Sequence, residues 1–85
     1  MKTWNVIILP KAGKRLERVP RQERERIIKV LYELRDDPFR HDFKPLHDQP
    51  LWRLRVGPWR VLCRVERREM TVYVLTVGPR GDVYK

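Results

Sequence analysis

Two strands and the turn between them are predicted by residues 52–62, which read Trp-Arg-Leu-Arg-Val-Gly-Pro-Trp-Arg-Val-Leu. Apolar and basic side chains alternate on both sides of Gly57 and Pro58, a pattern typical of a β-hairpin with one packed and one exposed face. With these two residues as the turn, the register pairs Val56 with Trp59, Arg55 with Arg60, Leu54 with Val61, and Arg53 with Leu62. The arginines then share one face, and the tryptophans at 52 and 59 point to the opposite, packed face.

The arginines at positions 53, 55 and 60 need an explanation, because like charges directly opposite each other destabilise an antiparallel pair. A polyanion bound over this face would remove the repulsion, and phosphate is the obvious candidate. The alternation fits equally well with arginines that only contact water on the exposed face of a sheet. On the pattern alone, both interpretations stay open.

Length and charge narrow the class of protein. The 85 residues suffice for one domain, expected over residues 1–85, with a single modest core. Lysine and arginine total 20 against 11 acidic residues, which gives a net charge of +9. This excess is typical of nucleic-acid-binding domains, although an acidic protein partner would suit it equally well. Arginine outnumbers lysine 14 to six, and its planar guanidinium makes two-point phosphate contacts that lysine cannot make, which favours RNA or DNA.

The sequence offers little for a disulfide or a metal site. Cys63 is the single cysteine and lies in an apolar strand pattern, where it is expected to be a small buried hydrophobe. His41 and His47 have no third ligand nearby in the sequence, so surface histidines are favoured over a zinc pair, and a catalytic role for either stays open. No metal or cofactor is expected. The apolar run Val6–Leu9 is too short for a signal peptide or a membrane span, which predicts a cytoplasmic protein without membrane contact.

An α+β fold is predicted from the remaining patterns. In order, the expected elements are a strand over 4–9, helices over 10–20 and 21–35, a loop over 39–50, and strands over 51–56, 59–66 and 70–77. The second helix is predicted from the apolar stripe Ile27, Ile28, Leu31 and Leu34. Short connections make the last three strands an antiparallel meander. We expect both helices on one face of a four-stranded sheet, with the basic hairpin face directed away from them.

Three segments carry a resemblance to a known family: Lys44-Pro45-Leu46, the hairpin of residues 52–62, and Val77-Gly78-Pro79-Arg80-Gly81-Asp82-Val83-Tyr84. Over nearly its whole length the chain resembles the RelE/ParE superfamily of toxins from type II toxin-antitoxin systems, and it looks closest to the RelE-like mRNA interferases. The resemblance implies the RelE-like, microbial-ribonuclease-type fold. RelE-like nucleases and ParE-like gyrase poisons share much of this pattern, so the segments do not separate the two branches.

RelE-like toxins enter the ribosomal A site and cut mRNA by moving a 2′-hydroxyl onto the adjacent phosphate. By this resemblance Arg53 and Arg55 would grip the mRNA backbone, and Arg60 would stabilise the pentacoordinate phosphate. Arg80 matches an arginine near the leaving oxygen, and Tyr84 matches a C-terminal tyrosine that stacks on a base or accepts a proton. Two further basic positions are predicted to contact RNA, namely Lys44 and Arg64.

One departure from the family bears on the mechanism. The nucleases carry lysines at the positions of Arg53 and Arg55, and arginine, unlike lysine, does not lose its proton in proteins. Tyr84 is therefore the strongest candidate for the general base, in a metal-independent endoribonuclease. The implied partners are an acidic, partly disordered antitoxin, in a toxin-antitoxin hetero-oligomer, and the 30S A site with its mRNA. The alternatives are a ParE-type gyrase inhibitor without nuclease activity and a catalytically inactive nucleic-acid-binding relative.

Overall fold

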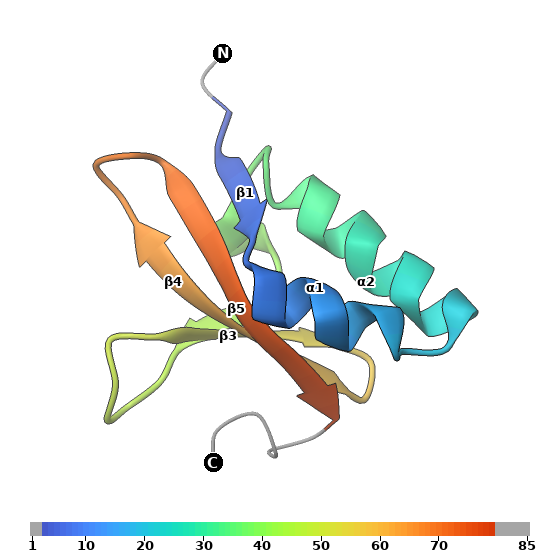
Figure 1. The fold of residues 1–85 in the computed structure, drawn as a ribbon. Coiled ribbons are helices and arrows are strands. Elements are labelled where there is room, and N and C mark those ends of the chain that lie inside the picture. The colour runs from blue at the N-terminus through green and yellow to red at the C-terminus, as the bar shows by residue number, and fades with distance from the viewer. Residues whose placement is uncertain (1–2, 80–85) are drawn as a thin grey trace.

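In the computed structural model, residues 3–79 are described, and they form one mixed β-sheet with two α-helices on one of its faces (Figure 1). In chain order the elements are β1 (Asn5–Ile8), α1 (Pro10–Glu17), α2 (Arg21–Glu33), the short 3-10 helix η1 (Pro38–Arg40), β2 (Phe43–Pro45), β3 (Trp52–Val56), β4 (Trp59–Glu66) and β5 (Thr71–Pro79). The predicted α+β class and the placement of both helices on one face are confirmed.

The strands lie in the order β1-β5-β4-β3-β2. β1 runs parallel to β5, and the other neighbouring strands are antiparallel. β3, β4 and β5 therefore form the predicted antiparallel meander. The helical segment between β1 and the rest of the sheet lets the N-terminal strand reach the far side of β5, where it becomes one edge of the sheet (Figure 1).

The sheet has five strands where four were predicted, and the additional strand is β2. The loop predicted over 39–50 is wrong for this part, because Phe43–Pro45 pair with β3. Phe43 is buried opposite Leu54, while Lys44 and Pro45 are exposed. A three-residue strand is too short for an alternating pattern to be visible in the sequence. Its proline suits an edge strand, which does not need every backbone donor.

The core lies between the helices and the covered face of the sheet. Pro10 opens α1 at its first turn, where the missing N–H is not needed. The helices and the residues that directly follow them bury Ala12, Leu16, Val19, Ile27, Leu31 and Leu34 against Leu54, Val56, Val61, Cys63, Val72, Val74 and Val77 of the sheet. The predicted stripe on α2 is right except at Ile28, which remains 45% exposed. Ile28 follows Ile27 by 100° around the helix and so turns out of the core.

The predicted hairpin register is confirmed at every pair. Val56 lies opposite Trp59 and Arg55 opposite Arg60, and the pairs Leu54–Val61 and Arg53–Leu62 follow. Gly57 has a φ of 58°, in the left-handed region that glycine enters without a steric cost. A register shift between Leu62 and Cys63 then changes the pairing of β4 with β5. The turn at Gly57 and Pro58 thus fixes which side chains of β3 and β4 share a face, whereas the register shift concerns the pairing of β4 with β5.

Cys63 is fully buried, as predicted. Burial raises the pKa of its thiol to about 12, so the thiol stays protonated at neutral pH and behaves as an apolar side chain.

Within residues 3–79, no helix has the length and hydrophobicity needed to span a lipid bilayer.

Candidate phosphate-binding face

The cross-strand register brings five predicted site residues to one face of the sheet. Side chains alternate along a strand, and Leu54, Val56 and Val61 are buried beneath the helices. Their neighbours in the strands must therefore project from the other face, as predicted. We call this surface the basic face and define it by Lys44, Arg53, Arg55, Arg60 and Arg64. Lys44 lies opposite Arg53, and Arg55 lies opposite Arg60.

Arg53 and Arg55 share a carboxylate that the sequence interpretation missed. One oxygen of Asp42, Oδ1, accepts a hydrogen bond from Arg53 Nη1 at 2.9 Å, and the other, Oδ2, lies 3.8 Å from Arg55 Nε. The Asp42 main chain is held as well, because its carbonyl accepts a hydrogen bond from Arg55 N at 2.9 Å. The β2–β3 register, continued by one residue beyond Phe43, places Asp42 opposite Arg55. Recognition of β2 would thus have found it.

Arg60 is the half-buried arginine of the hairpin's second strand. It faces Arg55 on one side and Gly78 of β5 on the other, and a glycine leaves the space beside the guanidinium unfilled by a side chain. In the described part of the chain, no carboxylate lies within 4.0 Å of its guanidinium. Asp42 thus offsets charge on β3 but does not reach Arg60, which leaves excess positive charge at the centre of the basic face.

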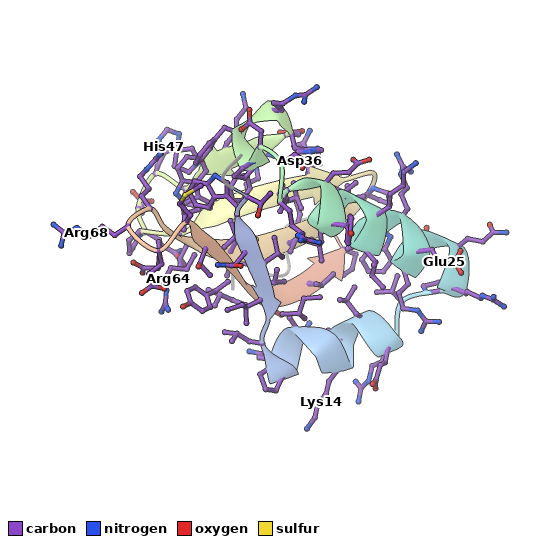
Figure 2. The ribbon with its side chains drawn as sticks, turned by 90° about the horizontal axis from the view of Figure 1, so that it is seen from above. Lys14, Glu25, Asp36, His47, Arg64 and Arg68 are labelled. Carbon is purple, nitrogen blue, oxygen red and sulfur yellow. The ribbon has the colours of Figure 1, made fainter. Side chains whose placement is uncertain are left out.

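Arg64 lies on the same face but is engaged locally. Its Nε is 3.3 Å from Glu66 Oε1, and its guanidinium lies over the Tyr73 ring at 4.7 Å. Tyr73 donates a hydrogen bond to Glu69 at 2.8 Å, and this bond, with a smaller effect of desolvation, raises the pKa of the phenol. Figure 2 shows Arg64 on the side of the molecule opposite Glu25 of α2. Arg64 is therefore part of the basic face, but its contacts are with Glu66 and Tyr73 and not with the cluster at Arg53, Arg55 and Arg60.

Arg80 and Tyr84 lie outside the described residues. The last described residue, Pro79, pairs with Trp59, and Gly78 pairs with Arg60. The last described residues of β5 therefore lie beside the turn end of the hairpin, next to the paired arginines.

The two tryptophans of the hairpin are packed on the helix side, as predicted. Trp59 lines a groove with Arg15, Arg18 and Val19. Trp52 packs against Phe39 and Phe43, with ring centroids 5.5 and 5.0 Å away. Neither ring belongs to the basic face, so they are not platforms for stacking bases there.

The histidines are not gathered into a metal site. His41 follows η1 and His47 is exposed in the segment before β3. Among residues 3–79, no three potential His, Cys, Asp or Glu ligands lie together.

A second surface feature is apolar and lies at the edge of the sheet. A groove of about 450 Å³ runs between β1 and α2 and is lined by residues 5–8, Ile28, Leu31, Tyr32 and Arg35. Large side chains remain uncovered around it, with exposed fractions of 43% for Ile7, 45% for Ile28 and 68% for Tyr32. We call this surface the β1–α2 groove.

Comparison with known proteins identifies the family. Residues 6–84 match the family model described as the ParE toxin of the type II toxin-antitoxin system parDE. No curated protein sequence matches the chain. A chain of the toxin-antitoxin complex RelBE2 from Mycobacterium tuberculosis is similar in structure, with 26% identity over 96% of this chain and 97% of the other and a TM-score of 0.83.

Two further structures agree with this. The RelE–RelB complex from Pyrococcus horikoshii matches with 26% identity over 94% of this chain and 98% of the other, at a TM-score of 0.80. The isolated RelE toxin of E. coli shares the fold, with 21% identity over 95% and 90% of the two chains and a TM-score of 0.74. Because the family model spans nearly the whole sequence, this chain belongs to the ParE toxin family of type II toxin-antitoxin systems.

Proposed function

We propose that this toxin is a metal-independent endoribonuclease that cuts mRNA in the ribosomal A site. The observation that carries the proposal is the arrangement of Arg53, Arg55 and Arg60 on the uncovered face of the sheet, with Arg55 and Arg60 directly opposite each other. This arrangement costs stability in the absence of an anion. Three closely spaced guanidinium groups suit a phosphodiester, which offers several acceptor oxygens to planar donors.

The proposed reaction forms a bond between the 2′-oxygen and the adjacent phosphorus and breaks the bond between that phosphorus and the 5′-oxygen. The products are a 2′,3′-cyclic phosphate and a 5′-hydroxyl. Arg53 and Arg55 hold the phosphate, and Arg60 stabilises the additional negative charge of the pentacoordinate state. Donors that are fixed before the reaction lower its barrier because they need not reorganise.

The proton transfers are assigned to residues near the C-terminus. An arginine does not act as a base, because it keeps its proton in proteins. We therefore assign removal of the 2′-hydroxyl proton to the phenolate form of Tyr84 and electrostatic stabilisation of the leaving 5′-oxygen to Arg80, while that oxygen takes its proton from water. Lys44 and Arg64 extend the contact along the RNA backbone.

The test is a cell-free translation reaction with a defined mRNA, with and without ribosomes, in which cut sites are mapped by primer extension. Wild type, Arg80→Ala and Arg60→Ala are compared with Arg21→Ala, a matched loss of an exposed arginine on α2. Cuts that need ribosomes, persist in Arg21→Ala and vanish in the other two variants support the proposal. Cuts on naked RNA would remove the ribosome from it, and the absence of cuts by folded wild-type protein would reject the nuclease.

A second candidate is a gyrase inhibitor, and it is favoured by the description of the matched family as ParE. Inhibition of DNA supercoiling by purified gyrase, unchanged in Tyr84→Phe, would support it, because that activity needs no catalytic base. Salt-sensitive nucleic-acid binding without either effect would leave the inactive, nucleic-acid-binding alternative.

The proposed regulator is an antitoxin in a toxin-antitoxin hetero-oligomer in the cytoplasm. Two of the similar structures are complexes with such a partner. An acidic, partly disordered chain suits the net charge of +9. The β1–α2 groove suits it too, since the edge strand β1 can pair with an added strand while Ile28 and Tyr32 contact apolar side chains.

A further inference from the structure

Among residues 3–79, Asp42 is the carboxylate that contacts both Arg53 and Arg55 of the basic face. We propose that Asp42 is a positioning residue: it holds Arg53 in the orientation needed for a phosphodiester, and its charge lowers the affinity of the face for polyanions in general. The effect on cleavage rests on the proposed nuclease function. The effects on arginine orientation and on RNA affinity do not.

Asp42 is fixed from several directions. Its carbonyl accepts from Arg55 N at 2.9 Å, and the next residue, Phe43, donates its N–H to His41 O at 2.7 Å and is itself buried. The carboxylate therefore projects from an ordered backbone at the end of β2. A long arginine side chain that bonds to such an anchor loses most of its rotamers before any ligand arrives.

The two arginines are held unequally. Arg53 makes the 2.9 Å hydrogen bond, and its side chain is only 20% exposed, whereas Arg55 is 3.8 Å away and 47% exposed. Arg53 is thus oriented by Asp42, and Arg55 keeps the freedom to turn toward a phosphate. Each guanidinium has five N–H donors, so the bond from Arg53 Nη1 to Asp42 leaves other donors for the ligand.

Charge and orientation have opposite consequences for function. Within residues 3–79, Asp42 is the carboxylate that lies within 4.0 Å of the cluster of Arg53, Arg55 and Arg60, and it contacts the first two of these. Its loss therefore increases the local positive charge and strengthens contact with any polyanion. The same loss allows Arg53 to move, and a misplaced group costs catalytic rate even when binding improves. If Asp42 positions Arg53, its loss raises RNA affinity and lowers the cleavage rate. If Asp42 only competes with the phosphate, its loss raises both the affinity and the rate.

The experiment compares Asp42→Ala and Asp42→Asn with wild type. Glu25→Ala and Glu25→Gln are matched controls, because Glu25 also bonds an arginine, Arg21 at 3.2 Å, but on exposed α2. Circular dichroism melting identifies any variant that fails to fold, and Asp42→Asn, which keeps an acceptor oxygen, decides if Asp42→Ala fails.

Three quantities are measured: the dissociation constant for a single-stranded RNA oligonucleotide as a function of salt, the single-turnover cleavage rate on programmed ribosomes, and the mobility of the Arg53 Nε–H group in nitrogen–proton NMR spectra. For Asp42→Ala we expect a salt slope steeper by about 0.7 and cleavage slower by about tenfold or more. We also expect an Arg53 signal as mobile as that of exposed Arg68. For Asp42→Asn we expect the same salt slope as for Asp42→Ala, because both remove the charge. We expect faster cleavage than in Asp42→Ala, because asparagine keeps an acceptor oxygen for Arg53.

Cleavage that rises together with affinity in Asp42→Ala would overturn the proposal, and so would an Arg53 signal that does not change. A slope change of the same size in Glu25→Ala would show a general charge effect and would also overturn it. Wild type that binds RNA but cuts no message rejects the nuclease instead. In that case the Arg53 signal and the salt slopes still decide the role of Asp42.

Discussion

Arg55 of β3 lies directly opposite Arg60 of β4, on the face of the sheet that α1 and α2 do not cover. Residues directly opposite each other on antiparallel strands have Cβ atoms about 5 Å apart, so the two arginine side chains lie close together. Asp42 reaches the Arg55 side of this pair and leaves Arg60 without a described carboxylate partner within 4.0 Å among residues 3–79. The pair is therefore expected to destabilise the free protein, and it lies in the proposed phosphate site.

Replacement of Arg60 by threonine should stabilise the fold and abolish the activity. The substitution removes the repulsion from Arg55 and introduces a good strand former, and we expect the free energy of unfolding to rise by about 0.2–1 kcal/mol. Urea denaturation measures this, and the ribosome-dependent cleavage assay measures the loss of function. Arg21→Thr on exposed α2 is the control. Lower stability together with full cleavage would show that Arg60 has only a structural role.

The conformation of the turn that places Arg55 opposite Arg60 can be tested by replacing two glycines, one in the turn and one in α1. Gly57→Ala should destabilise the protein by about 1 kcal/mol or more, because residue 57 has a φ of 58° and an added Cβ would lie 3.1 Å from Arg26 Nη1. Gly13→Ala in α1 should instead stabilise it by about 0.5–1 kcal/mol, since a Cβ there meets only Ile8 Cγ2 at 3.9 Å. Equal effects of the two changes in urea denaturation would contradict the assigned hairpin geometry.

The hairpin could be predicted from the sequence because its pairing is local. The turn residues Gly57 and Pro58 fix the register, and the alternation of arginines with apolar residues fixes the face. The placement of Arg53, Arg55 and Arg60 on one uncovered surface follows from these two facts alone. Their roles in chemistry came from the family resemblance and remain proposals.

The features that were missed depend on contacts distant in sequence. β2 has three residues and pairs with a strand that begins seven residues after it ends, so no local pattern marks it. Asp42 was hidden for the same reason. Ile28 was assigned to the core because the spacing of apolar residues cannot show how wide the covered surface is, and in the structure Ile28 lines the open β1–α2 groove and stays 45% exposed.

The buried thiol of Cys63 should make the fold less stable at alkaline pH. Burial raises the pKa of its thiol from 9.0 to about 12, so between these values the unfolded chain releases a proton that the folded chain keeps. The free energy of unfolding should therefore fall as pH rises above 9, by up to about 1.4 kcal/mol per pH unit, and the contribution below that pH is intact. Urea denaturation at pH 8 and pH 10 should show a larger loss for wild type than for Cys63→Ala. An equal loss in both would assign the effect to other groups.

If the antitoxin binds in the β1–α2 groove, substitutions there should weaken antitoxin binding without affecting the basic face. Ile28 is 45% exposed, so Ile28→Glu and Ile28→Lys should each cost about 1 kcal/mol of folding free energy and leave mRNA cleavage intact. Both should weaken binding of the cognate antitoxin in isothermal titration calorimetry, because both remove an apolar contact. Gln22→Glu and Gln22→Lys make the same charges on the same helix and are the controls. If Ile28→Lys binds an acidic antitoxin more tightly while Ile28→Glu binds less tightly, charge and not apolar contact governs this surface, and the groove is not the docking site.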